Sequence, residues 1–267
     1  MDERALQRRI YGGAALVAAA ALALAGTAPA AAATSADQDA VFDFSDPAAA
    51  TVLVNGKNPL DPLDYVPADL TPAGGSENLM APEAAVALAV LLEHAAADGH
   101  RLMVESAYRS HSRQDALYRR YVARYGEAYA STISAKPGTS EHQLGLAADV
   151  GLASGECSLE RCFGDTPAGR WIDGNAGEFG FIVRYPDGQE DVTGYKYEPW
   201  HLRYIGTTAV AAMAETGAQT FEEFAAAVTV EGAGEVPGSG GTPSTIARPE
   251  APSLDWYPKW SLRIRPF

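Results

Sequence analysis

Apolar residues in the middle of the chain recur at spacings that predict helices alternating with short strands. Between Pro82 and Gly99 they follow a helical period, with a proline suited to the first turn and a glycine suited to the end. This segment therefore predicts a core-facing helix. Residues 102–106 predict a short strand, and a second helix with an N-terminal serine cap is expected to end at Tyr125.

The second half of the chain continues this alternation. Further strands are expected at 147–150, 180–185 and 200–205, and further helices at 127–134, around Trp171, at 207–215 and from Thr220. The last of these helices has Glu223 three residues after Thr220, which is the spacing of a capping box. The strands at 180–185 and 200–205 are expected to lie in the same sheet.

The start of the chain has a different pattern. Arginines near the N-terminus precede an apolar run and then small residues, a layout typical of a secretory signal peptide at residues 1–33. Counted from residue 10, the same segment is nearly long enough to remain as an uncleaved membrane anchor. Residues 34–50 are small and acidic without apolar periodicity, and they predict a flexible tether.

One globular domain, at residues 51–230, is the simplest prediction for the rest. A chain of 267 residues that is 47% hydrophobic can bury one good core, and its pattern does not divide into two units. Residues 231–252 are rich in glycine, proline, serine and threonine and predict a linker. The aromatic and basic tail at 253–267 could either pack on the domain or touch the cell wall or membrane.

The charge balance narrows the choice of partners. The formal net charge is −14, and removal of residues 1–33 leaves it strongly negative. Nucleic acid is therefore not expected as a partner, because binding phosphates needs a cationic face. We expect an exported protein, extracellular or associated with the cell wall, that touches the membrane only through its N-terminal segment if that segment stays uncleaved.

The chain has two cysteines, Cys157 and Cys162, in a polar segment. In an oxidising compartment such a pair predicts a disulfide rather than a metal site. The bond would close a short loop and stiffen it locally.

Two short stretches contain the groups typical of a catalytic zinc site. The first contributes His142 and Asp149, and the second contributes His201 and the spare carboxylate of Glu198. Three ligands of the types His, Asp and His leave the fourth position of zinc open for water, whereas structural sites usually close it. The same three ligands could also hold iron(II), so the residue types alone do not decide the metal.

Three separated blocks along the chain are more specific than their single residues. They read SAYRS at 106–110 followed by Gln114, PGTSEH at 137–142, and YEPWHLRY at 197–204. These blocks, in this order, resemble the VanY-type D-alanyl-D-alanine carboxypeptidases, and the resemblance covers about residues 52–207. It implies an α+β fold, in which a small, mainly antiparallel sheet carries the zinc site and helices flank the sheet.

The resemblance also implies roles for individual residues. One zinc ion per chain is expected on His142, Asp149 and His201, with Glu198 as the base that takes a proton from zinc-bound water. Arg109 is expected to hold a carboxylate or the developing oxyanion. Substrate contacts are expected from Gln114, Ser140, Tyr108 and Tyr185.

Two further expectations concern the segment around Glu198. The Glu198 side chain could form a salt bridge with Arg203 and not act as the base. Pro199 lies between Glu198 and His201, which favours a bent segment over an uninterrupted central strand.

The function implied by the resemblance is removal of a C-terminal D-alanine from peptidoglycan stem peptides. The scissile bond could be the D,D bond of a pentapeptide or the L,D bond of a tetrapeptide. Two other functions are an endopeptidase that cuts within stem peptides and a non-catalytic wall-binding module with a structural zinc. Glu198 and Arg109 argue against the last, because a structural site would need neither.

Overall fold

The computed structural model describes residues 42–232. The predicted signal peptide, most of the predicted linker and the predicted tail lie outside the described residues, as does the first part of the predicted tether. Within residues 42–232, no helix combines the length and the apolar character that crossing a membrane would require.

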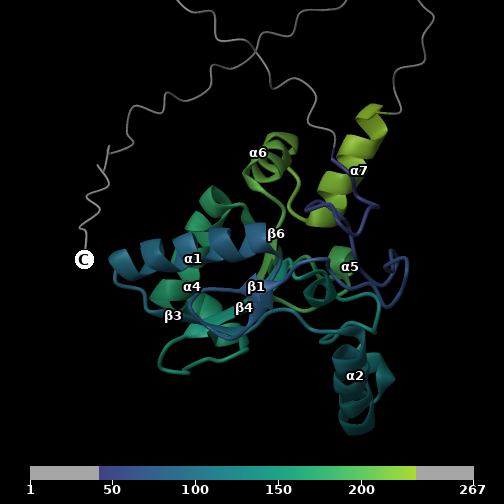
Figure 1. Ribbon diagram of the computed structural model, residues 1–267, viewed down its shortest axis with the longest axis horizontal. Helices are drawn as coiled ribbons and strands as arrows, with labels where there is room; N and C mark the ends of the chain where they lie inside the picture. Colours follow the sequence, from purple (N-terminus) through teal and green to yellow (C-terminus); the bar gives the residue numbers. More distant parts are fainter. Residues whose placement is uncertain (1–41, 233–267) are drawn as a thin grey trace, which may run out of the picture. The chain divides into compact units, whose positions relative to one another are not determined.

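Helices and short strands alternate along the described chain, as the periodicity predicts (Figure 1). The strands are β1 (Thr71–Pro72), β2 (Leu79–Met80), β3 (Leu102–Ser106), β4 (Ala147–Leu152), β5 (Phe181–Tyr185) and β6 (Glu198–Tyr204). The α-helices are α1 (Pro82–Ala97), α2 (His111–Tyr125), α3 (Glu127–Ala130), α4 (Pro167–Asn175), α5 (Glu190–Thr193), α6 (Thr207–Thr216) and α7 (Phe221–Gly232). Three 3-10 helices are η1 (Glu141–Leu144), η2 (Arg161–Asp165) and η3 (Ala176–Phe179).

Four of these strands form one antiparallel sheet in the order β3-β4-β6-β5, while β1 and β2 form a separate two-stranded sheet. Helices pack around this small sheet, so the predicted α+β fold with an antiparallel sheet is confirmed. The two central strands, β4 and β6, come from segments about 50 residues apart in sequence, at 147–152 and 198–204.

The sheet has an apolar face and a polar face because side chains alternate along each strand. On β4, Ala148 and Val150 belong to the main core cluster, whereas Asp149 between them points to the other side. On β6, Leu202 belongs to that core and the neighbouring Arg203 does not. The apolar face packs against α1 and α4, and the polar face is left for the functional groups.

The folded domain begins before Thr51, where the sequence analysis placed it. Phe42 and Phe44 pack against α7, with Phe44 5.9 Å from Phe221 and 5.7 Å from Phe224 between ring centroids. Residues 42–50 therefore belong to the domain and not to a tether. Two phenylalanines in a run of small and acidic residues were too few to produce a periodic pattern.

The end of the domain also differs slightly from its expected limit at residue 230, because α7 continues to Gly232. Its start matches the predicted capping box: the Glu223 backbone N–H donates to Thr220 Oγ1 at 3.2 Å. In return, the Thr220 backbone N–H donates to Glu223 Oε2 at 3.1 Å.

Cys157 and Cys162 form the expected disulfide, which closes a loop between β4 and η2. The sequence separation of five residues makes this a local link.

Replacement of Phe44 by alanine tests whether residues 42–50 belong to the domain. We expect Phe44→Ala to lower the free energy of unfolding by about 1 to 3 kcal/mol, because a half-buried phenylalanine loses its aromatic contacts. Urea denaturation measures this change. Val86→Ala on the exposed side of α1 is the control, since Val86 is 66% exposed. Equal stability of the two variants would show that residues 42–50 do not stabilise the fold.

Candidate active site

The register of the two central strands brings two of the predicted ligands together. Asp149 of β4 is the direct antiparallel partner of His201 of β6, and directly opposed residues project to the same face of a sheet. His201 Nδ1 lies 3.1 Å from Asp149 Oδ1, and both side chains are buried. These residues are close in space because of strand pairing, although 52 positions separate them in sequence.

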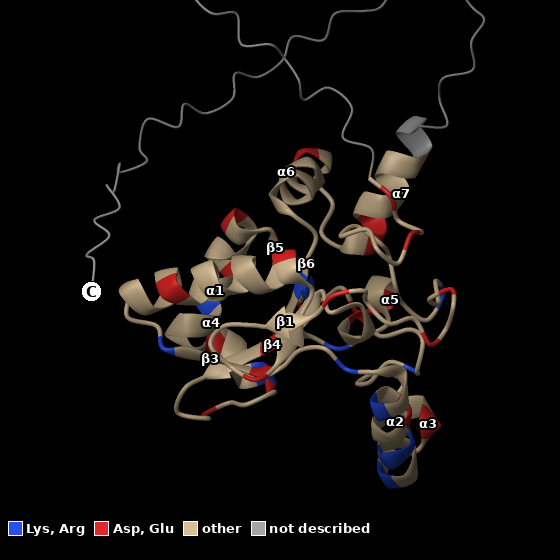
Figure 2. Cartoon of the chain, in the orientation of Figure 1, with Lys and Arg blue, Asp and Glu red and all other residues tan. Residues whose placement is uncertain are grey.

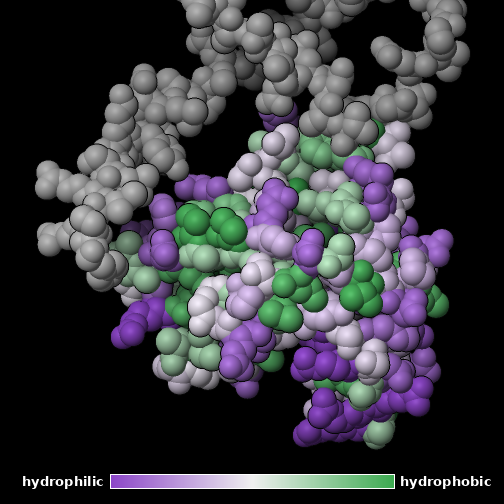
Figure 3. All heavy atoms as spheres, in the orientation of Figure 1, coloured by the Kyte–Doolittle hydropathy of each residue, from purple (hydrophilic) through white to green (hydrophobic). Residues whose placement is uncertain are grey.

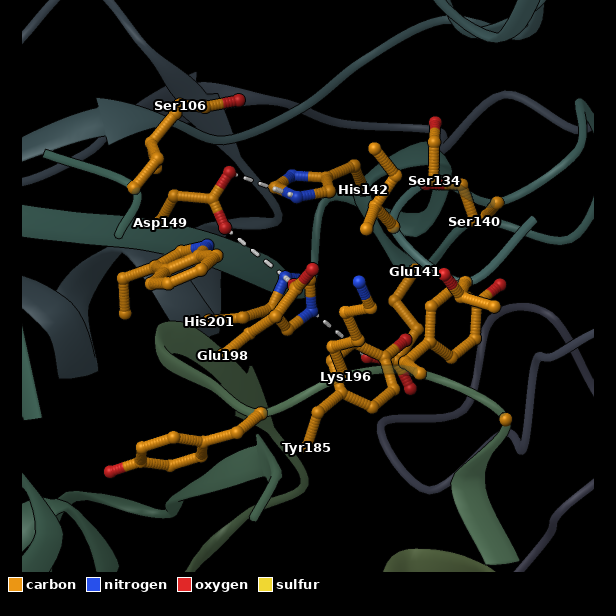
Figure 4. A pocket seen from close by; sticks show the side chains of 18 of the residues that line it. Ser106, Ser134, Ser140, Glu141, His142, Asp149, Tyr185, Lys196, Glu198 and His201 are labelled. Atoms are coloured by element: carbon orange, nitrogen blue, oxygen red, sulfur yellow. Dashed lines mark hydrogen bonds and ion pairs between the residues drawn. The ribbon is translucent and has the colours of Figure 1, made fainter. Parts of the chain in front are cut away.

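His142 reaches the same point from η1. Its Nδ1 lies 2.7 Å from the Ala107 carbonyl oxygen, which fixes the orientation of the ring, and its Nε2 lies 3.3 Å from Asp149 Oδ2 (Figure 4). One ligand atom from each of His142, Asp149 and His201 lies within 4.8 Å of the others. In the described part of the chain, this is the one group of His, Cys, Asp or Glu residues with metal-ligand geometry.

The protonation preferences of Asp149 and His201 favour a positive charge beside them, whereas burial lowers the pKa of His142. Burial would raise the pKa of Asp149, but the two neighbouring histidines hold it below its ordinary value. Burial would likewise lower the pKa of His201, but hydrogen bonds with Asp149 and Glu141 raise it to about 9. A metal cation supplies the same positive charge once the histidines are neutral.

Glu198 lies at the start of β6, with its Oε2 3.9 Å from His201 Nδ1. Burial raises the pKa of Glu198 to about 7, while His201 acts in the opposite direction. A cation held by the three ligands would lower this pKa, because an opposite charge favours the ionised carboxylate. The carboxylate is placed to exchange a proton with a group bound beside the cluster.

The expectation that Pro199 disfavours an uninterrupted central strand agrees with the structure, in which the pairing is interrupted at the proline although the strand continues through it. Strand β6 includes Pro199 and lies between β4 and β5 in the sheet. The pairing of β5 with β6 shifts in register between Val183 and Tyr185, and this irregularity falls opposite the proline. Because the pairing is irregular here, the backbone N–H that proline lacks is not needed for a ladder hydrogen bond. Glu198 therefore remains on the same strand as His201.

Glu141 is part of the site although the sequence analysis did not single it out. Its side chain has no exposed surface, and its Oε2 lies 3.3 Å from His201 Nε2, on the opposite side of the ring from Asp149. Its Oε1 accepts hydrogen bonds from Arg184 Nε at 2.7 Å and from Arg203 Nη1 at 2.9 Å. These two arginines keep the pKa of Glu141 below its ordinary value although burial would raise it.

The two arginines are themselves fully buried and have further partners. Arg184 donates to both carboxylate oxygens of Glu222 on α7, at 2.6 and 2.8 Å, and Arg203 donates to the carbonyl oxygens of Ala50 and Val52. Arg203 therefore pairs with Glu141 and not with Glu198. The sequence clue to these residues was an arginine between apolar neighbours in a strand, Arg184 after Val183 and Arg203 after Leu202.

Arg109 approaches the cluster from the loop before α2. Its Nη2 lies 3.9 Å from Asp149 Oδ2, and its Nη1 donates to Gln114 Oε1 at 2.9 Å. The Gln114 side chain is buried and donates in turn to Ser134 Oγ and to the Ala135 carbonyl oxygen. Gln114, expected to contact substrate, instead holds the guanidinium of Arg109 in place.

Of the three remaining residues that were expected to contact substrate, two line the cleft and one does not. Ser140 and Tyr185 line the cleft at the cluster, and the Tyr185 ring lies 5.0 Å from the His201 ring between centroids. Tyr108 is half-buried, and its side chain is not part of the cleft lining.

The cluster opens into a cleft of about 1070 Å³. Its walls come from the start of β6, from α2, from the segment after α3 and from the disulfide loop, which contributes Leu159 and Arg161. Tyr195 and Lys196 also line it, and neither was expected from the sequence; Lys196 is labelled in Figure 4. Such a cleft has room for several residues of a peptide.

The residues present fit a zinc ion. The donor set consists of two imidazoles and one carboxylate, all buried and convergent, with a further carboxylate beside them that is not needed as a ligand. Both histidines are held on their other nitrogen, His142 by a carbonyl and His201 by Glu141, as is usual for ligating histidines.

Comparison with known proteins agrees with this arrangement. Residues 77–207 match the family model for VanY, D-alanyl-D-alanine carboxypeptidase. The protein YodJ of Bacillus subtilis is 44% identical over 142 residues, which are 53% of this chain and 52% of YodJ. The chain thus spans about half the length of this curated relative.

Solved structures show the same similarity over a larger share of their length. The LD-carboxypeptidase LdcB is 39% identical, with a TM-score of 0.60 over 65% of this chain and 84% of that chain. A mutant of the vancomycin resistance D,D-pentapeptidase VanY, solved in complex with Zn(II), is 33% identical, with a TM-score of 0.57 over 66% of this chain and 98% of that chain. The chain therefore belongs to the VanY family of D-alanyl-D-alanine carboxypeptidases.

Proposed function

We propose that this protein is a zinc-dependent carboxypeptidase that removes a C-terminal D-alanine from peptidoglycan stem peptides. The observation that carries the proposal is the buried cluster of His142, Asp149 and His201 at the base of a peptide-sized cleft, with Glu198 beside it. His142, Asp149 and His201 would hold one zinc ion per chain. When bound, zinc supplies a Lewis acid and lowers the pKa of water at its open position.

Side chains of the protein would transfer the proton and bind the substrate. Glu198 takes a proton on its side-chain carboxylate from the attacking water and passes it to the amine of the leaving D-alanine. Arg109 presents its guanidinium at the edge of the cluster, where it can hold the substrate carboxylate or the developing oxyanion. Gln114 and Ser106 hold that guanidinium in position through hydrogen bonds.

Glu141 positions His201 and does not touch the substrate in this proposal. It accepts from the ring nitrogen that faces away from the metal site, which leaves Nδ1 directed at the cluster. Its own position depends on Arg184 and Arg203, so the orientation of the ligand is fixed through buried ion pairs.

The site of action follows from the substrate. We propose that residues 1–33 direct export and that the protein works outside the cell or at the cell wall, where peptidoglycan stems are found. The layout of basic, apolar and small residues in this segment supports the proposal.

Defined stem peptides test the reaction. The purified zinc-loaded protein should release one D-alanine from a pentapeptide ending in D-Ala-D-Ala, from a tetrapeptide ending in a single D-Ala, or from both. Relatives named for each type of activity support both substrates. Mass spectrometry of the products identifies the bond that is cut. Cleavage within the stem would instead show an endopeptidase, and no hydrolysis of either peptide would favour a non-catalytic module.

Glu198→Gln tests the base. The substitution keeps the size of the side chain and removes its basicity, so we expect turnover to fall by about 10²-fold to 10⁴-fold while zinc stays bound. Steady-state kinetics with parallel elemental analysis give the two numbers. Near-normal hydrolysis by zinc-replete Glu198→Gln would require another base.

His142→Ala tests the ligand set. Only two protein ligands remain in this variant, so we expect it to lose both zinc and activity. Elemental analysis after dialysis against a weak chelator measures the zinc content, with His111→Ala as the control because His111 lies outside the cluster. A full equivalent of zinc on His142→Ala would show that the ligand assignment is wrong.

A further inference from the structure

Three tyrosines form a row that leads away from the cleft along α2 and α3. The ring centroids of Tyr121 and Tyr125 lie 6.1 Å apart, and those of Tyr125 and Tyr129 lie 5.5 Å apart. Tyr121 lines the cleft. We call Tyr121, Tyr125 and Tyr129 the tyrosine row.

The outer rings of the row are open to solvent, with Tyr125 44% and Tyr129 46% exposed. Cations flank them: the Arg124 guanidinium lies 5.1 Å from the Tyr125 ring centroid, and Lys196 Nζ lies 3.9 Å from that of Tyr129. Lys196 itself lines the cleft, whereas Tyr125 and Tyr129 do not.

Helix α2, which carries Tyr121 and Tyr125, stands apart from the rest of the domain. Figure 1 shows α2 projecting away from the sheet and from α1, α4, α6 and α7. Basic residues follow one another along α2 in Figure 2, and by sequence they are arginines; the surface in this region is strongly hydrophilic (Figure 3). Gln114 and Tyr118 are its buried residues, and they lie in its first half, whereas the last turn is exposed. Exposed aromatic rings on such an arm do not stabilise a core, and they are available to a ligand.

The length of the arm matches the length of a stem peptide. Gln114 contacts Arg109 at the reaction site, and Tyr121 and Tyr125 follow it by about 10 and 16 Å along a helix that rises 1.5 Å per residue. An extended peptide spans about 3.3 to 3.6 Å per residue, so the four residues before the scissile bond of a pentapeptide stem span about 14 Å. With its C-terminus at the reaction site, a stem peptide directed along α2 would bring its amino end to the row.

The amino end of a stem peptide is the end that is attached to the amino sugars of the glycan strand. We propose that the tyrosine row binds these sugars, so that the enzyme recognises the glycan together with the peptide. A pyranose ring offers a face of C–H bonds and an edge of hydroxyl and amide groups. Tyrosine matches both, with an apolar ring face and a polar hydroxyl. This inference rests on the proposed function, because it takes the stem peptide as the substrate in the cleft.

The test compares two matched substrates, the free stem peptide and the same peptide attached to its disaccharide. We expect the wild type to show a higher kcat/KM for the disaccharide-linked peptide. In the double variant Tyr125→Ala/Tyr129→Ala, kcat/KM for the disaccharide-linked peptide should be about 3-fold to 10-fold lower than in the wild type, which is the effect of one or two aromatic contacts. Its kcat/KM for the free peptide should stay unchanged. Neither residue lines the cleft. Val86→Ala, an exposed apolar position on α1, is the control and should behave like the wild type.

Co-sedimentation with purified glycan strands that carry no peptides gives a readout independent of catalysis. The Glu198→Gln protein should bind these strands, with little dependence on salt, and the added Tyr125→Ala/Tyr129→Ala substitutions should abolish binding. Equal use of the two substrates by the wild type, or an unchanged preference in the double variant, would overturn the inference. Binding that disappears steeply with salt would also overturn it, because it would indicate capture of a polyanion by the arginines. If the wild type hydrolyses neither substrate, the proposed function fails, and glycan binding alone decides the role of the row.

Discussion

Two arginines without exposed surface, Arg184 and Arg203, share one carboxylate oxygen of Glu141 beneath the candidate metal centre. An unpaired charge at such depth would cost several kcal/mol, so each of these side chains is tolerable only while the others are in place. The arrangement leaves two positive charges facing one carboxylate. Glu222 supplies the second negative charge through a bidentate contact with Arg184.

This group of charges connects distant parts of the fold with the chemistry. Glu141 contacts His201 directly, Arg203 binds the carbonyl oxygens of the N-terminal segment, and Arg184 reaches α7. The elements that cover the polar face of the sheet therefore also determine how a ligand histidine is oriented. A fold with the same apolar core but without these ion pairs would leave the His201 ring free to turn.

Local patterns along the sequence were sufficient for most of the helices and strands. The start of α1 on a proline, the end of α2 before a glycine and the capping box of α7 are all encoded within a few residues, and the structure has them as expected. The pairing of the two cysteines could also be predicted, because two cysteines allow one pairing only. The ligand set His142, Asp149 and His201 came from residue types and from resemblance, and its members do converge.

What local patterns could not show was which distant charges meet. Glu141 lies 43 residues from Arg184 and 62 from Arg203, and no spacing rule links these positions. Gln114 was expected at the substrate, but its hydrogen bonds show that it supports Arg109. Phe42 and Phe44 were hidden by small and acidic neighbours, since their partners are supplied by a helix about 180 residues later.

The position of Glu222 in the last described helix has a consequence for the order of synthesis. A ribosome makes the chain from its N-terminus, so His142, Asp149 and His201 all exist before the carboxylate that completes the pairing of Arg184. A partly made chain would hold these three side chains without the charge balance that fixes them. The centre can reach its final geometry only once nearly the whole domain has emerged, so the three side chains of the cluster are made well before the site around them is complete.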